Sequence, residues 1–273
     1  MPHMEVNANQ VYVEDSGTPT GRPDAPAVVF GHGLLFSGRM FAAQVERLRD
    51  RYRCVTIDWR GQGKSPAAAH GYDMDTLSED AIAVIEQLGL GAVHYVGLSM
   101  GGFVGMRLAA RRPELVRSLM LLDTSAGPED PDKVSRYRLL AKVYGVLGMR
   151  LLRSRVEPIM FGPTFLADPD SRPHVAAWMA ELGAAERSGV KKAIFGVTDR
   201  EPILAELGRI TAPTLVVVGA DDVATPVAKS ETIAGAIAGA RLEIVADSGH
   251  SSTIEQPDVL ADLIESFLEE QQG

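Results

Sequence analysis

The stretch Val93-His94-Tyr95-Val96-Gly97-Leu98-Ser99-Met100-Gly101-Gly102 decides the fold. Its apolar first half is typical of a buried strand, and it runs through G-x-S-x-G into a helical pattern. Small residues two places before and after a serine permit a strained strand-to-helix turn that exposes the hydroxyl. We therefore expect Ser99 to be a nucleophile and the N–H of Met100 to face a developing oxyanion. Because the pattern also occurs by chance, the remaining chain must supply its context.

Strand-like and helical patterns alternate on both sides of this stretch. The apolar runs lie at residues 27–30, 53–57, 118–122, 213–218 and 241–246, and residues 11–14 predict a short edge strand. Such alternation is typical of βαβ units and predicts one doubly wound, mostly parallel sheet. Ligands bind at the carboxyl ends of the strands in sheets of this kind.

The alternation stops from 127 to 206, where helical spacing is interrupted by prolines. We expect an inserted helical lid at 127–206 and a core made of residues 1–126 and 207–273. Residues 127–205 hold twelve Lys and Arg against ten Asp and Glu, so the lid is basic on an acidic body. A solvated helix face is one interpretation of its arginines, and attraction of an anionic substrate is the other. These arginines are Arg136, Arg138, Arg150, Arg153 and Arg155.

The composition is that of an ordinary soluble globular protein, with 45% hydrophobic and 23% charged residues among 273. A net charge of −9 argues against a nucleic-acid partner, which needs a basic face. Residues 1–10 lack a basic and apolar leader pattern, and no run of 18 apolar residues occurs. We therefore expect a cytoplasmic protein without a membrane partner. Cys54 lies in an apolar run, so we expect it to be a buried strand residue.

The run at 27–30 enters the loop Gly31-His32-Gly33-Leu34-Leu35, where a ligand can approach the backbone. The N–H of Leu34 is the expected second oxyanion donor. His32 is expected to shape this loop through its own hydrogen bonds. Substrate binding or a role as catalytic base are its alternatives.

Two further candidates for chemistry follow strands late in the chain. Asp221 and Asp222 come after the run at 213–218, and His250 follows the run at 241–246. With Ser99 they occur in the order nucleophile, acid, base, each past a different parallel strand, so the fold can bring them to one edge. Asp123, after the strand at 118–122, is a third possible acid. The six histidines lack metal-ligand spacing, so we expect no metal.

Nearly the whole chain resembles the α/β-hydrolase family. The motifs that carry the resemblance are His32-Gly33, Asp58-x-Arg60-Gly-x-Gly63-x-Ser65, Gly97-x-Ser99-x-Gly101, Gly219-x-x-Asp222-x-x-x-Pro226 and Gly249-His250. Two of them, Gly-Leu-Ser-Met-Gly-Gly and Asp-x-Arg-Gly-x-Gly-x-Ser, are similar to those of small bacterial esterases, enol-lactonases and cofactor-free haloperoxidase-like hydrolases. The resemblance says least about the lid, where such relatives diverge.

The resemblance implies an eight-stranded-type α/β-hydrolase sheet and a carboxylesterase or lactonase that needs no cofactor. Ser99 would attack an ester or lactone carbonyl and form an acyl-enzyme, with His250 as the general base. The family spacing to Pro226 favours Asp222 as the acid over Asp221 and Asp123. The expected partner is a small-molecule ester or lactone.

Other readings stay open. Asp58-Trp59-Arg60-Gly61 resembles cofactor-free dioxygenases of this fold, C–C hydrolases share the fold, and some members act as lactone-sensing receptors. Apolar lid residues predict either a substrate pocket or the packed core of the lid. They are Met149, Met160, Phe161, Phe165, Trp178, Met179 and Phe195.

Overall fold

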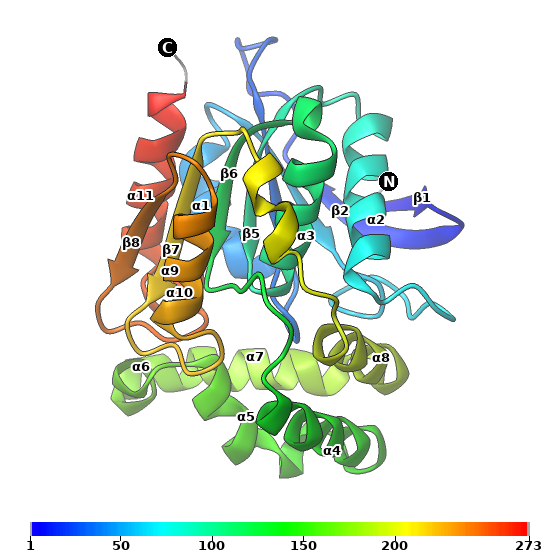
Figure 1. Cartoon of the computed structure of the whole chain (residues 1–273). Helices are drawn as coiled ribbons and strands as arrows, with labels where there is room; N and C mark the ends of the chain where they lie inside the picture. Colours follow the sequence, from blue (N-terminus) through cyan, green and yellow to red (C-terminus); the bar gives the residue numbers. More distant parts are fainter. Residues whose placement is uncertain (1, 272–273) are drawn as a thin grey trace.

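The computed structural model describes residues 2–271 and contains one eight-stranded sheet with helices on both faces (Figure 1). The strands are ordered β1-β2-β4-β3-β5-β6-β7-β8. The pairs β1–β2 and β2–β4 are antiparallel and the remaining pairs are parallel. The strands are β1 His3–Val6, β2 Asn9–Asp15, β3 Ala27–Gly31, β4 Arg53–Asp58, β5 Val93–Leu98, β6 Val116–Leu122, β7 Thr214–Gly219 and β8 Arg241–Val245. The expected doubly wound, mostly parallel sheet is confirmed.

The edge of the sheet differs from the prediction, because β2 lies between β1 and β4 and β1 is the edge strand. The two strands are joined by a tight hairpin in which Asn7 and Ala8 both have positive φ angles, 47° and 60°. This is the turn geometry that matches the twist of a two-residue hairpin. The apolar pattern missed β1 because only Val6 of its four residues is buried.

The central strands are apolar along their whole length because helices cover both faces of the sheet. Every residue of β3, β5 and β7 is buried. One layer contains α1 and α11, which contact each other, and the other contains α2, α3 and α9 with the 3-10 helix η5. The bounds are η1 Gly38–Phe41, α1 Ala42–Leu48, α2 Met74–Gln87, α3 Met100–Arg111, η2 Pro113–Leu115, η5 Leu204–Arg209, α9 Val227–Ala236, α10 Ser252–Glu255 and α11 Pro257–Glu270.

Between β6 and β7 the chain forms a group of helices that lies beyond the carboxyl edge of the sheet (Figure 1). It consists of α4 Pro131–Leu147, η3 Met149–Leu151, α5 Arg153–Met160, α6 Pro163–Ala167, η4 Pro169–Ser171, α7 Arg172–Ala184 and α8 Arg187–Thr198. We call residues 131–198 the lid. The expected lid boundary at 206 falls inside η5, which packs on α3 and α9 of the core.

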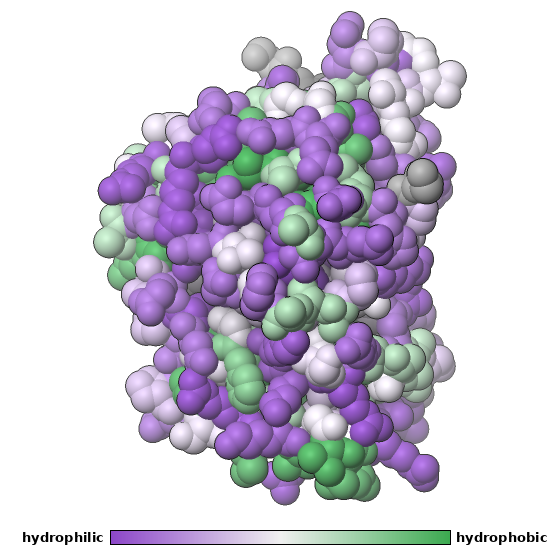
Figure 2. Space-filling model, turned by 90° about the vertical axis from the view of Figure 1, so that its right-hand side faces the viewer, coloured by the Kyte–Doolittle hydropathy of each residue, from purple (hydrophilic) through white to green (hydrophobic). Residues whose placement is uncertain are grey.

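The surface is largely hydrophilic, with a hydrophobic patch at the lid end of the molecule (Figure 2). Exposed aliphatic side chains of the lid are Leu139, Val146, Leu147 and Leu151. Within residues 2–271, no helix is both long and apolar enough to cross a lipid bilayer.

Candidate active site

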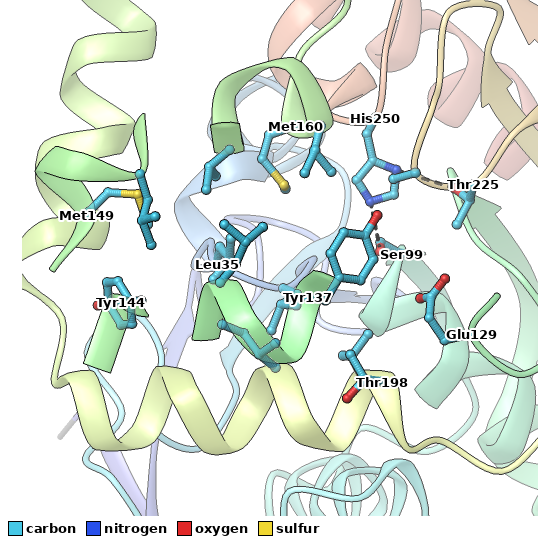
Figure 3. Close-up of a pocket in the computed structure, with 18 of the residues that line it drawn as sticks. Leu35, Ser99, Glu129, Tyr137, Tyr144, Met149, Met160, Thr198, Thr225 and His250 are labelled. Carbon is cyan, nitrogen blue, oxygen red and sulfur yellow. Dashed lines mark hydrogen bonds between the residues drawn. The ribbon is translucent and has the colours of Figure 1, made fainter. Parts of the chain in front are cut away.

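Ser99 occupies the sharp turn between β5 and α3. Its φ and ψ of 51° and −109° lie in a sparsely populated region. Such a conformation persists only where the surrounding residues hold the backbone in place. The backbone does so from both sides, since the Ser99 N–H donates to the Leu122 carbonyl at 2.8 Å and its carbonyl accepts from Thr124 Oγ1 at 2.8 Å. The turn leaves the hydroxyl at the cavity beneath the lid (Figure 3).

Gly97 and Gly101 are required by the closeness of three backbone segments at this turn. A Cβ atom on Gly97 would collide with the backbone of Gly101, and a Cβ on Gly101 would collide with the carbonyl of Gly31. The Gly101 N–H also donates to the His32 carbonyl at 3.1 Å. The glycines of G-x-S-x-G thus join the turn to the loop after β3.

His250 connects the serine to a carboxylate. Its Nε2 lies 2.9 Å from Ser99 Oγ and its Nδ1 lies 2.8 Å from Asp222 Oδ2. Asp222 is fixed in turn by N–H bonds from Ala224 and Thr225 to Oδ1, and by the Thr225 hydroxyl to Oδ2 at 2.7 Å. Three residues from three separate loops, predicted from the sequence, therefore lie in one hydrogen-bonded chain.

The two alternative acids lie elsewhere. Asp123 is fully buried, accepts the Gly219 N–H at Oδ1 and the Ser252 hydroxyl at Oδ2, and makes no hydrogen bond to His250. The side chain of Asp221 is only half-buried and makes no hydrogen bond or ion pair within residues 2–271. Neither carboxylate holds the imidazole.

Burial and neighbouring charge set the ionisation of this chain of groups. Burial opposes the charged form of His250, but the Asp222 carboxylate outweighs it and raises the His250 pKa. Burial likewise opposes the Asp222 charge, yet His250 and the hydrogen bonds from His250 and Thr225 lower the Asp222 pKa. Burial, reinforced by the Asp222 charge, raises the pKa of Asp123 to about 8. Asp222 is therefore the ionised carboxylate and Asp123 the neutral one at pH 7.

Glu255, on the short helix α10, holds the loop that carries His250. Its carboxylate accepts backbone N–H bonds from Gly162, Gly249 and Ser251 at 2.8 to 3.0 Å. Burial raises its pKa, against the effect of these bonds. Because Gly162 follows α5, Glu255 also attaches the lid to the His250 loop. Glu255 was not predicted from the sequence, because no motif or periodicity marks it as a buried carboxylate.

The backbone N–H groups of Met100 and Leu34 make no hydrogen bond within the described part of the chain. Met100 is the first residue of α3, so its N–H has no acceptor within the helix. In the loop after β3, the N–H of Gly33 faces Met40 Sδ and the N–H of Leu35 donates to Gln62 Oε1 at 2.8 Å. The intervening Leu34 N–H makes no hydrogen bond within residues 2–271. Both N–H groups are therefore available to a ligand, and their role as oxyanion donors stays a prediction.

His32 lies in the same loop but outside the cavity. It is fully buried, with Nδ1 2.7 Å from the Gly33 carbonyl and Nε2 accepting the Trp59 N–H at 2.9 Å. Burial lowers its pKa, so the ring is neutral and both nitrogens are engaged in the loop. The structure thus places His32 as a loop-shaping residue and not against a substrate.

The cavity beneath the lid has a volume of about 110 Å³ and is lined mainly by apolar side chains (Figure 3). Met149 and Met160, two of the apolar lid residues singled out from the sequence, line it. Phe161, Trp178 and Met179 do not, which corrects their assignment to the substrate pocket. They are buried in the lid core, where the Phe36 ring packs edge-on against Trp178 and Phe161. Lid packing against the loop after β3 accounts for these apolar residues.

The basic residues of the lid do not face the cavity. Among the described residues that line it, none is Lys or Arg. The five arginines named above are all exposed, and Arg138 and Arg153 pair with Asp199 and Glu157 at the surface. The solvated-face interpretation of their charge therefore fits the structure, and the attraction of an anionic substrate does not.

The site combines a serine at a strand-to-helix turn with an acid and a histidine that follow it in the chain. On a mostly parallel sheet, this arrangement is typical of α/β-hydrolases. The chain belongs to the alpha/beta hydrolase fold family, whose pattern it matches over residues 26–257. The protein is accordingly a hydrolase of small molecules.

Relatives and solved structures of similar length support this class. The protein named "Putative carbamate hydrolase RutD" from Pseudomonas syringae pv. syringae is 28% identical over 261 residues, covering 91% of this chain and 95% of its own. The enol-lactonase from Burkholderia xenovorans LB400 has a TM-score of 0.90 and 26% identity, covering 98% of this chain and 100% of its own. A thermophilic esterase from Thermogutta terrifontis has a TM-score of 0.88 and 26% identity, covering 99% and 98%.

Proposed function

We propose that the protein is a serine hydrolase that cleaves a carboxylic ester or lactone through an acyl-enzyme on Ser99. The observation that carries this proposal is the pair of contacts at His250, 2.9 Å to Ser99 Oγ and 2.8 Å to Asp222 Oδ2. The similarity to an esterase and an enol-lactonase supports the choice of ester or lactone.

In the first half of the cycle, His250 Nε2 takes the proton of Ser99 Oγ as the oxygen attacks the carbonyl carbon. Asp222 holds the Nδ1–H and stabilises the imidazolium. The N–H groups of Leu34 and Met100 donate to the oxyanion. Collapse of the tetrahedral intermediate leaves the acyl group on Ser99, and His250 returns its proton to the departing alkoxide.

In the second half, His250 removes a proton from water, which attacks the acyl carbon and releases the acid. The proton then passes from His250 to Ser99 Oγ, which restores the starting state. Every group in this cycle belongs to the chain, apart from substrate and water.

The test is hydrolysis of p-nitrophenyl butyrate, a γ-lactone and an alkyl carbamate by the wild type and by Ser99→Ala. We expect Ser99→Ala to lower kcat by at least about 10³-fold on each substrate that turns over. Equal rates with and without oxygen separate hydrolysis from the cofactor-free oxygenase alternative. Ester turnover that survives in Ser99→Ala would overturn the proposal.

A further inference from the structure

The cavity has a polar end and an apolar end (Figure 3). Ser99, His250 and Thr225 lie at one end, and Glu129 and Thr198 lie on the same side. Met149 and Tyr144 lie at the opposite end, beyond Leu35 and Met160. A substrate whose carbonyl reaches Ser99 therefore extends its remaining atoms along an apolar wall.

The apolar end offers no polar group to a substrate. The Tyr144 hydroxyl donates to the Leu182 carbonyl at 3.1 Å, so only its ring faces the cavity. Other lid residues that line the cavity are Leu140, Met149, Leu152 and Val156, and none of them carries a strong hydrogen-bonding group. A charged or strongly polar group placed there would lose its water without gaining a partner, which is costly. An aliphatic chain would instead leave water for an apolar surface.

Within residues 2–271, Glu129 is the only carboxylate that lines the cavity. The cation that pairs with it, Arg200, is not among the lining residues. Glu129 Oε2 pairs with Arg200 Nη1 at 2.9 Å, both side chains being buried. Arg200 donates to the carbonyls of Gly127 and Val197, and its guanidinium lies over the Phe103 ring, 4.4 Å from the centroid. An incoming anion therefore meets a carboxylate and no free cation.

We infer that the cavity selects neutral esters with an aliphatic acyl chain and rejects acyl chains that end in a carboxylate, because the apolar end offers that group neither water nor a hydrogen-bond partner. This inference rests on the proposed function, since it specifies the acyl group that Ser99 would receive.

The first experiment compares p-nitrophenyl hexanoate with the mono-p-nitrophenyl ester of adipic acid, which has the same chain length and a terminal carboxylate. Burial of the terminal carboxylate at the apolar end without a partner predicts kcat/KM on the order of 100-fold higher for hexanoate. Ser99→Ala is the blank for both esters. Equal rates, or preference for the adipate ester, would overturn the inference while leaving the proposed function intact.

Binding gives a readout that does not depend on turnover. Calorimetry on Ser99→Ala with hexanamide and with its ω-carboxylate analogue, 6-amino-6-oxohexanoate, is expected to show tighter binding of the neutral amide. If neither ester turns over but hexanamide still binds better, the proposed function fails and the account of the cavity stands. Equal affinities, or tighter binding of the anion, would contradict it.

Variants test the two ends separately. Glu129→Gln, at the Ser99 end, is expected to leave the hexanoate-to-adipate ratio of kcat/KM unchanged, whereas Met149→Lys, which brings a cation to the apolar end, is expected to narrow that ratio about tenfold. Met149→Trp fills the apolar end and is expected to shift the preference toward shorter acyl chains. Leu151→Trp, two residues on and 64% exposed, is its control. An unchanged ratio in Met149→Lys, a narrowed ratio in Glu129→Gln, or an unchanged chain-length preference in Met149→Trp would contradict the corresponding part.

Discussion

The Nδ1 atom of His250 lies 2.8 Å from Oδ2 of Asp222, although a second buried acid, Asp123, lies close enough to Asp222 for the Asp222 charge to raise the Asp123 pKa. The hydrogen bonds of Asp123 are made with the Gly219 N–H and the Ser252 hydroxyl. The direction of the His250 ring, rather than the mere closeness of an acid, thus decides which carboxylate can hold its tautomer.

Replacement of each carboxylate by its amide tests this assignment. We expect Asp222→Asn to lower kcat for p-nitrophenyl butyrate by about 10⁴-fold, because the amide no longer fixes the Nδ1–H or stabilises the imidazolium. Asp123→Asn should keep kcat within about tenfold of the wild type, since a neutral amide can bond to Gly219 and Ser252 as the neutral acid does. The reverse ranking of the two variants would show that Asp123 is the acid.

The activity should fall as the pH falls through the pKa of His250, because only the neutral imidazole accepts the Ser99 proton. The Asp222 carboxylate raises that pKa, so the acid limb of kcat/KM should lie above the ordinary histidine value of about 6.5. The residual activity of Asp222→Asn should show the limb moved to lower pH. A limb that stays in place in this variant would mean that Asp222 does not set the His250 pKa.

Asp123 makes stability depend on pH. Its folded pKa of about 8 is above the unfolded value of about 3.9, so its favourable contribution is present at low pH and is lost as pH rises between these values. Asp123→Asn does not titrate. Urea unfolding should therefore show the free energy of unfolding of Asp123→Asn rising relative to the wild type between pH 5 and pH 7.5. A constant difference would show that Asp123 is ionised in the fold.

Glu255→Gln should destabilise the fold and slow catalysis together. The carboxylate accepts the N–H of Ser251 at Oε1 and those of Gly162 and Gly249 at Oε2. A glutamine amide can keep the two bonds at one oxygen but presents N–H groups to the third donor, which costs about 1 to 3 kcal/mol. Denaturant unfolding and kcat are the measurements. The exposed Glu269→Gln on α11 is the control, and equal stability of the two variants would contradict this role.

Ser99, Asp222 and His250 could be predicted because each lies in the segment that follows a strand of a parallel sheet, and such strands end at one edge. Leu34 and Met100 were named as oxyanion donors for the same reason, since Leu34 lies in the loop after β3 and Met100 begins α3 directly after Ser99. Glu255 could not, because a polar residue on a four-residue helix has no periodic signal that marks it as buried.

The cavity lining could not be predicted either. Tyr144 on α4 and Trp178 on α7 are both apolar residues at helical spacing within the lid. Periodicity shows which face of a helix is apolar, but not whether a neighbour fills the space against it. Phe36 fills that space for Trp178, whereas Tyr144 faces the cavity. The position of Glu129 depends on the same packing.

The most direct test of the central claim is the site of acylation. The wild type is mixed with p-nitrophenyl butyrate, quenched in acid within the first turnovers, digested and analysed by peptide mass spectrometry. We expect the peptide that contains Ser99 to gain a butyryl group, a mass increase of about 70 Da for C₄H₆O. The corresponding peptide of Ser99→Ala should gain none. Turnover with an acyl group on another residue, or undiminished turnover in Ser99→Ala, would contradict it.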